Sequence, residues 1–211
     1  EHKVMNIIKE DLLDMKKRFG DERRTEISRD TSEMEIEDLI AEEDIVVTIS
    51  HQGYIKRQTL DNFRNQKRGG VGKTGGSGKK IDDSAEHLFL STTHYNILFF
   101  TNIGRVYRQK GYEIPEAGRT AKGTAIINLL PLTQGEKITA VIPVKEFVED
   151  QFLFMATNRG TVKKMNLKDL ESARKAGIVA INLDDKEDLI GVELTDGNSE
   201  IILATRNGLA I

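Results

Sequence analysis

The sequence lacks cysteine and tryptophan altogether, and its 211 residues include only 3 prolines. Without cysteine the chain can form neither disulfide bonds nor thiolate metal sites, which fits a cytoplasmic protein. No apolar run approaches the roughly 20 residues of a membrane-spanning helix, and the first residues do not resemble a signal peptide. We therefore expect a cytoplasmic protein with no membrane partner, long enough for one or two domains with a hydrophobic core.

No arrangement of residues typical of a catalytic or metal site stands out in the sequence. The four histidines, His2, His51, His87 and His94, show no metal-ligand spacing. His51 and His94 fall near expected turns, where we expect their side chains to be solvated. The acidic pairs 82–83 and 184–185 lie in polar turn segments. We predict no catalytic residue and no metal site.

The net charge of −3 conceals an uneven distribution of charge along the chain. Residues 1–44 contain 8 basic and 15 acidic residues, whereas residues 53–80 contain 8 basic residues and a single acid, Asp61. Binding to a polyanion depends on the local potential rather than on the total charge. The negative total therefore does not exclude a nucleic acid as partner.

The first 20 residues predict an amphipathic helix, because apolar side chains recur at steps of three or four. These side chains are Val4, Ile8, Leu12, Met15 and Phe19. Gly20 follows where a glycine in the left-handed conformation would end the helix. Residues 21–44 read as an acidic linker, since 30–44 carry eight acids and no base, with a short helical turn expected around 36–40.

From residue 45 onward the chain repeats a unit of about fifty residues, the length of a propeller blade. Each copy has an apolar strand, a polar turn with a glycine and a returning strand, which predicts a β-hairpin. The turn glycines are Gly53, Gly104, Gly160 and Gly208, spaced 51, 56 and 48 residues apart. The fourth copy is only begun.

The segments between the hairpins repeat as well. Residues 123–129 match 177–183, and each leads to another apolar run, at 138–144 or 189–194. A unit therefore offers about four strands, the content of one blade. Because a single blade cannot bury both faces, neighbouring blades must stack. The sequence predicts a mainly β, propeller-like fold over residues 45–211, preceded by one amphipathic helix.

Basic residues recur in phase with the turn glycines. Four positions after the glycine stands Arg57, Arg108 or Lys164, and fifteen positions after it stands Arg68, Arg119 or Lys175. Surface hairpins are often basic because such residues protect exposed strand edges, and this is the simpler explanation. Recurrence in stacked blades instead predicts an arc of cations, which matches the phosphates of a bent duplex and reads no bases. The candidate DNA contacts are Lys56, Arg57, Lys67, Arg68, Lys73, Lys79, Lys80, Arg105, Arg108, Arg119, Lys122, Lys163, Lys164, Arg174 and Lys175.

Residues 66–80 contain six glycines and five basic residues. Such a stretch can be a flexible linker, or it can bring backbone N–H groups together around an anion. A nucleotide-binding P-loop does not fit, because the motif requires glycine where Lys67 stands.

The heptapeptide within this stretch resembles a family signature. Gln66-Lys67-Arg68-Gly69-Gly70-Val71-Gly72 is similar to the gyrase-A box, Gln-Arg-Arg-Gly-Gly-Lys-Gly, of the C-terminal domain of the DNA gyrase A subunit. Lys67 replaces the first arginine of the box, and Val71 replaces its lysine. The resemblance extends over the whole chain, through 20–27, 104–107 and 128–132.

This resemblance implies a fold and a role. The family fold is a six-bladed pinwheel whose neighbouring blades exchange strands, and residues 45–211 would form three blades and the start of a fourth. Residues 1–20 would be the last helix of the coiled-coil arm. The domain would wrap duplex DNA, so that ATP-dependent strand passage introduces negative supercoils, with the box essential for supercoiling.

The resemblance also implies partners and a compartment. The partners would be double-stranded DNA, a second copy of the gyrase A subunit and the gyrase B subunit, in the bacterial cytoplasm at the nucleoid. The DNA-cleaving tyrosine would lie upstream of this chain, and ATP and Mg²⁺ would be used on other domains or subunits, so this fragment would bind no cofactor.

Three alternatives stay open on sequence. The first is the C-terminal domain of the topoisomerase IV A subunit, whose similar but shorter pinwheel lacks an intact box. The second is a propeller-type scaffold for protein interactions with no role in nucleic-acid binding. The third is an enzyme that binds a nucleotide through the glycine-rich stretch.

Overall fold

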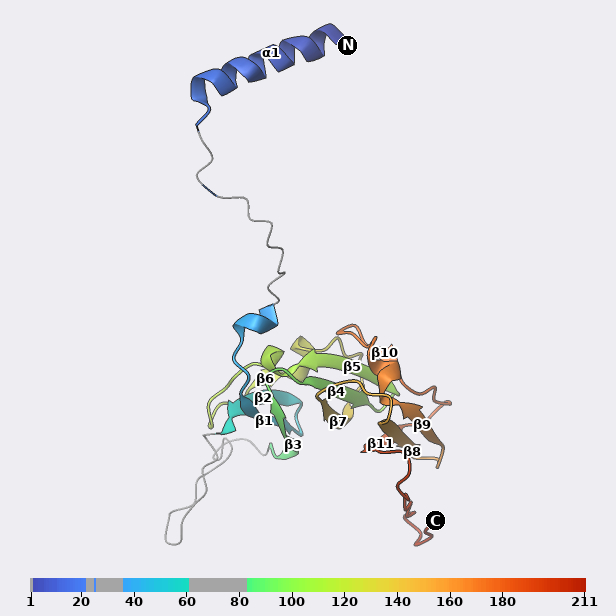
Figure 1. Cartoon of the computed structure of the whole chain (residues 1–211). Helices are drawn as coiled ribbons and strands as arrows, with labels where there is room; N and C mark the ends of the chain where they lie inside the picture. The colour runs from blue at the N-terminus through green and yellow to red at the C-terminus, as the bar shows by residue number, and fades with distance from the viewer. Residues whose placement is uncertain (1, 22–24, 26–35, 61–82) are drawn as a thin grey trace. The chain divides into compact units, whose positions relative to one another are not determined.

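The computed structural model describes residues 2–21, 25, 36–60 and 83–211. The chain divides into two compact units, Glu1–Glu35 and Ile36–Ile211 (Figure 1). Helix α1 (His2–Phe19) belongs to the first unit, and all of the strands belong to the second. The assignment of these parts to an arm helix, an acidic linker and a pinwheel remains a prediction.

Helix α1 confirms the predicted amphipathic helix, and it buries none of its residues. Its apolar stripe is open, from Val4 at 59% exposure to Phe19 at 75%. The prediction for Gly20 was wrong, since Gly20 is absent from the residues with positive φ. Its N–H donates to the carbonyl of Lys16 at 2.9 Å, so the helical bonding pattern continues through the glycine instead of reversing at it.

The second unit contains three antiparallel sheets, which lie side by side in chain order (Figure 1). Their strands are β1 (Asp44–Ser50), β2 (Tyr54–Thr59), β3 (Ala85–Thr92), β4 (Asn96–Thr101), β5 (Arg105–Lys110), β6 (Thr124–Ala125), β7 (Ile138–Val144), β8 (Phe152–Thr157), β9 (Val162–Asn166), β10 (Ile178–Val179) and β11 (Leu189–Thr195). The strand orders are β3-β1-β2-β6, β10-β5-β4-β7 and β11-β8-β9. The predicted four-stranded blade is confirmed in the first two sheets.

Strands are exchanged between neighbouring repeats. Strand β6 comes after the second hairpin in the chain but pairs with β2 of the first, and β10 comes after the third hairpin but pairs with β5 of the second. A two-residue strand thus ties each of the first two sheets to the repeat that follows it. Within the described residues the three sheets do not close into a ring.

The hairpin turns depend on glycine at the predicted positions. Gly53, Gly104 and Gly160 have φ of 79°, 76° and 86°, the left-handed region that other residues rarely adopt. The fourth copy shows the same turn at Gly208, with φ of 82°. Its flanking residues form an isolated bridge between Ala204 and Ala210 rather than assigned strands.

Two hydrophobic cores fill the spaces between the sheets. The first joins β1 and β2 to β4 and β5, with Phe99 and Tyr107 fully buried. The second joins β4, β5 and β7 to β8 and β11, with Phe100, Leu153 and Met155 fully buried. Adjacent residues on β4 therefore supply different cores, as the period-2 alternation of a strand requires. This confirms the expectation that neighbouring blades stack to bury their faces.

Within the described residues of the second unit there are also four short 3-10 helices: η1 (Ile36–Leu39), η3 (Gly111–Glu113), η4 (Ile126–Asn128) and η5 (Leu167–Leu170). The helix η1 confirms the turn expected around 36–40. Helices η3 and η5 occupy the same place in successive repeats, directly after β5 and β9.

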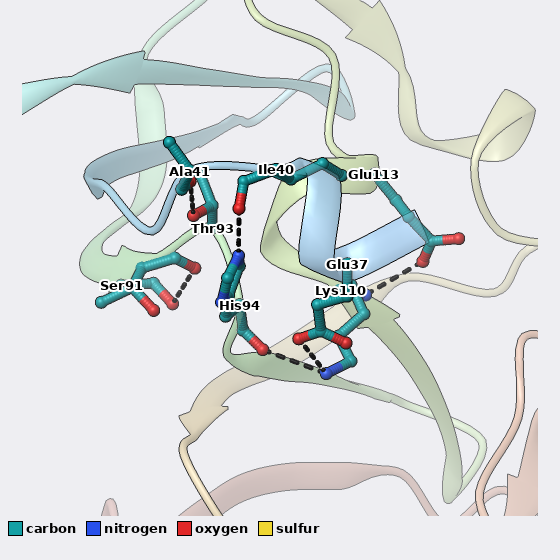
Figure 2. A network of polar contacts seen from close by, with 9 residues as sticks. Glu37, Ile40, Ala41, Ser91, Thr93, His94, Lys110 and Glu113 are labelled. Atoms are coloured by element: carbon teal, nitrogen blue, oxygen red, sulfur yellow. Dashed lines mark hydrogen bonds and ion pairs between the residues drawn. The ribbon is translucent and has the colours of Figure 1, made fainter. Parts of the chain in front are cut away.

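The segment that leads into β1 is held against the turn between β3 and β4 (Figure 2). Lys110 pairs with Glu37 at 2.8 Å, and the Thr93 hydroxyl donates to the carbonyl of Ala41 at 2.8 Å. His94 lies half-buried with its Nε2 at 2.8 Å from the carbonyl of Ile40. The expectation that His94 is solvated was therefore wrong, because this segment folds back over the turn.

Candidate nucleic-acid interface

Part of the predicted interface lies outside the described residues. This holds for the box, Gln66 to Gly72, and for Lys73, Lys79 and Lys80. In the chain these positions come after β2, which ends at Thr59, and before β3, which begins at Ala85. The other ten candidate cations lie within the described residues.

The cations four positions after each turn glycine occupy the same register in their hairpins. Arg57 lies opposite Val47, Arg108 opposite Leu98 and Lys164 opposite Phe154, each on the returning strand. The sequence count from the glycine thus corresponds to a real structural repeat. The turn fixes the strand register of each hairpin, so residues at equivalent positions in the sequence repeat lie at equivalent positions in the three hairpins.

Two of these cations bind the following repeat. Arg57 donates from Nε to the carbonyl of Ile114 at 2.7 Å, and Arg108 donates from Nη1 to the carbonyl of Glu171 at 2.7 Å. Arg57 also lies 3.6 Å from the Glu116 carboxylate. Each arginine therefore contacts the start of a segment that we call a connector, residues 115–123 in the second repeat and 172–177 in the third.

Lys56 is buried against the first connector, with 6% of its surface exposed. Its ammonium lies 3.0 Å from the carbonyls of Arg119 and Ala121 and 3.5 Å from that of Gly118. Burial lowers the pKa of this lysine. Lys56 thus holds the connector backbone, and we leave it out of the phosphate contacts proposed below.

The cations of the connectors themselves face outward. Lys122, Arg174 and Lys175 are exposed, and Arg119 is half-buried. The ammonium of Lys122 lies 3.8 Å from the ring centroid of Tyr54, a cation–π geometry. Because the connector carbonyls are bound by the preceding repeat, the charged side chains remain on the solvent side.

The last group of candidates lies on β5 and β9. Lys163 and Lys164 are exposed, and their ammonium groups donate to the carbonyls of Ala180 at 2.6 Å and Gly197 at 2.8 Å. Arg105 lies over the ring of Tyr107 at 5.6 Å. Like the arginines, these cations make contacts inside the protein, mainly to carbonyl oxygens. Such contacts leave their positive charge uncompensated.

Two buried glutamates were missed in the sequence. Glu136 accepts from the Tyr107 hydroxyl at 2.9 Å and from the backbone and hydroxyl of Thr133, and Glu187 accepts from the Thr157 hydroxyl and the backbone of Asp184. Both precede the strand that borders the hairpin, β7 or β11. The spacings Thr133-x-x-Glu136 and Asp184-x-x-Glu187 were the signal, since an acceptor three residues on can close a turn.

These contacts change the acidity of the groups involved. Burial opposes ionisation of Glu136, but the hydrogen bonds from Thr133, Thr101 and Tyr107 outweigh it and lower the pKa of that carboxyl. Burial and the neighbouring Glu136 raise the pKa of Tyr107 to about 12. Hydrogen bonds from Thr157 and Thr161 lower the pKa of Glu187. Glu136 and Glu187 are thus ionised structural groups, not proton donors.

We expect the stability of the sheets to fall in acid because of these glutamates. A carboxyl whose pKa is lowered by folding stabilises the protein above its unfolded pKa, and this stability is lost as the pH falls through the folded value. The free energy of unfolding, measured with urea, should therefore drop between about pH 5 and pH 3. E136Q should flatten this drop, whereas E146Q, at an exposed glutamate, should leave the profile unchanged. Equal profiles for both variants would contradict the assignment.

The described residues show no other site chemistry. Among them no group of three or more His, Asp or Glu side chains could hold a metal ion. No described helix is both long and apolar enough to cross a membrane.

The three sheets coincide with three matches to a family model. Residues 44–89, 95–145 and 151–196 each match the model described as DNA gyrase C-terminal domain, beta-propeller. The chain belongs to this family. In this DNA gyrase C-terminal domain the family model thus matches once for each of the three repeats found in the sequence.

Whole-chain relatives agree with this membership. The chain is 49% identical over 211 residues to the DNA gyrase A subunit of Clostridium acetobutylicum, 50% over 209 to that of Halalkalibacterium halodurans and 49% over 193 to that of Escherichia coli. These matches cover 100%, 99% and 92% of this chain but 25%, 25% and 22% of the relatives. The chain thus spans about a quarter of their length.

Solved structures show the same fold. The C-terminal domain of DNA topoisomerase IV matches with a TM-score of 0.66 and 29% identity, covering 82% of this chain and 52% of that one. A DNA gyrase A C-terminal domain matches with a TM-score of 0.56 and 24% identity, covering 80% and 53%. The second likeness supports the fold alone.

Proposed function

We propose that this DNA gyrase C-terminal domain binds duplex DNA along the cations of successive repeats and holds it in a bend. The observation that carries the proposal is the equivalence of the two connectors. Each begins beside an arginine of the preceding repeat, ends at a left-handed glycine and exposes cations between these points. Cations repeated from blade to blade match the regular charge of a duplex, about one per 1.7 Å of axis.

The binding we propose is to phosphates rather than to bases. Lysine and arginine on short surface segments reach the backbone of a duplex and release its counterions, so affinity falls steeply with salt. Smooth bending of 20–30 base pairs requires on the order of 1–6 kcal/mol, which several modest ion pairs can offset. Sequence preference should be slight. The cations of the box and Lys73, Lys79 and Lys80 are proposed as further phosphate contacts.

The role of the whole protein is part of the proposal. In the intact gyrase A subunit, assembled with a second copy of itself and with the gyrase B subunit, the bend would determine the sign of strand passage and so introduce negative supercoils. The catalytic tyrosine, ATP and Mg²⁺ would belong to other parts of that assembly, a bacterial type IIA topoisomerase of the cytoplasm and nucleoid. This domain would contribute DNA geometry and no bond-making chemistry.

Topoisomerase IV is the second candidate, because its C-terminal domain has the higher TM-score of the two neighbours described. The box-like heptapeptide at 66–72 and identities of 49–50% to gyrase A subunits favour gyrase. The supercoiling activity of the assembled enzyme distinguishes the two candidates, since gyrase introduces negative supercoils into relaxed DNA and topoisomerase IV does not.

A salt titration of duplex binding by this chain tests the proposal. We expect log K to fall linearly with log salt, and R174A/K175A to make the slope shallower by about 2, because two cations are removed. K145A removes an exposed lysine that does not recur in the repeats and should change neither slope nor affinity. Weak binding that salt does not affect would instead support a protein-interaction scaffold.

A further inference from the structure

Arg57 and Arg108 each reach out of their own hairpin to one defined point of the next repeat. Ile114 directly follows η3, and Glu171 directly follows η5, so both acceptor carbonyls mark the first residue after an equivalent 3-10 helix. Both donor–acceptor distances are 2.7 Å. The backbone of each arginine also contacts its connector, Arg57 through Pro115 and Ala117 and Arg108 through Arg174.

The far end of each connector is held by the same preceding hairpin. A Cβ on Gly123 would lie 2.5 Å from the carbonyl of Ile55, and one on Gly177 would lie 2.4 Å from the ring of Tyr107. Both glycines also have positive φ, so other residues would be strained there. Strands β6 and β10 begin just beyond them and pair with β2 and β5.

Each connector is therefore held at both ends by the preceding hairpin, while Lys122, Arg174 and Lys175 stay exposed to solvent. We propose that Arg57 and Arg108 are positioning residues, which hold the connectors at 115–123 and 172–177 so that their cations are ready to meet phosphates. This inference rests on the proposed DNA binding. The main role of Arg57 and Arg108 is then to position the connectors rather than to contact phosphates directly.

The physical reason is preorganisation. A charged donor to a carbonyl is stronger than a neutral one, and a connector that is already ordered loses less conformational entropy when DNA binds. A loose connector would carry the same charges but would have to be ordered on binding. Lys164 does not belong to this set, since its carbonyl partner, Gly197, follows β11 of its own repeat.

A double-mutant cycle with this chain separates positioning from direct contact. We expect R108A to weaken duplex binding about tenfold, and R174A/K175A to weaken it at least as much. On the R174A/K175A background R108A should then weaken binding less than about twofold, because the cations that it positions are gone. R108K keeps one donor and should recover most of the affinity. A further tenfold loss on that background would make Arg108 a direct contact and overturn the proposal.

Two controls test whether the loss of affinity comes from a general loss of stability, and whether Arg108 orders the connector in the absence of DNA. N102A removes a different contact between repeats, from Asn102 to Asp188 at 3.2 Å, and should leave affinity within about twofold. Hydrogen exchange at the amides of Ala173 and Gly177 should accelerate in R108A and not in N102A. Unchanged exchange in R108A would overturn the positioning role, whereas normal DNA affinity in R174A/K175A would instead overturn the proposed DNA interface.

Discussion

Alanine at Lys67, Arg68 and Lys73 is expected to slow supercoiling by the intact enzyme strongly while leaving relaxation of supercoiled DNA largely in place. These residues supply the positive charge of the box and its flank. If the box secures the bent DNA, its loss removes the directional bias of strand passage but not the chemistry of strand passage itself. We expect the supercoiling rate to fall at least about tenfold, because three phosphate contacts disappear together.

The measurement compares ATP-dependent supercoiling of relaxed plasmid with ATP-independent relaxation, using enzyme assembled from both kinds of gyrase subunit. The control variant K137A/K145A/R206A removes three exposed cations outside the connectors and the box. It should leave both activities unchanged. A parallel loss of both activities in the box variant, or no loss of either, would count against wrapping as the role of this domain.

Methionine at Lys56 is expected to destabilise the second unit by about 3 kcal/mol, because the carbonyls of Gly118, Arg119 and Ala121 would lose their hydrogen bonds to the charged ammonium. Methionine keeps most of the apolar stem, so the loss reports on the ammonium rather than on a cavity. Such a change would lower the melting temperature by about 6–12 °C for a unit of this size. Urea unfolding and calorimetry measure it directly.

Lys163 provides the matched control, because it stands three positions after its turn glycine just as Lys56 does. It is exposed on β9 and donates to a single carbonyl, that of Ala180. K163M should therefore lose less than about 1 kcal/mol. Equal losses for K56M and K163M would show that burial of Lys56 against the connector does not stabilise the fold as we describe.

Much of the architecture could be predicted from the sequence, because it depends on interactions between residues that are close together in the chain. Glycine at a tight turn and alternating apolar residues on either side predict a hairpin without knowledge of distant contacts. The hairpins at Gly53, Gly104 and Gly160 were confirmed for this reason. Gly20 was read incorrectly, because a glycine after a helix permits a left-handed cap but does not enforce one.

The candidate interface could be predicted only in part from the sequence. The phase of Arg57, Arg108 and Lys164 with the turn glycines was confirmed as a common register. Their acceptors were not predicted, since Ile114 and Glu171 lie about sixty residues away in the chain. The same limit hid the bond to Glu136 from Tyr107, which lies 29 residues earlier in the chain, on β5.

By itself, the sequence determined where this protein turns, which residues face inward along each strand and how often its cations recur, because these depend on short-range geometry. Only the tertiary structure decided which cations bind inside the protein and which face outward. That division depends on strands β6 and β10 crossing to the preceding hairpin, which brings carbonyls of one repeat within reach of the cations of another. Such pairing over long chain distances arises when the blades pack together, and no local pattern encodes it.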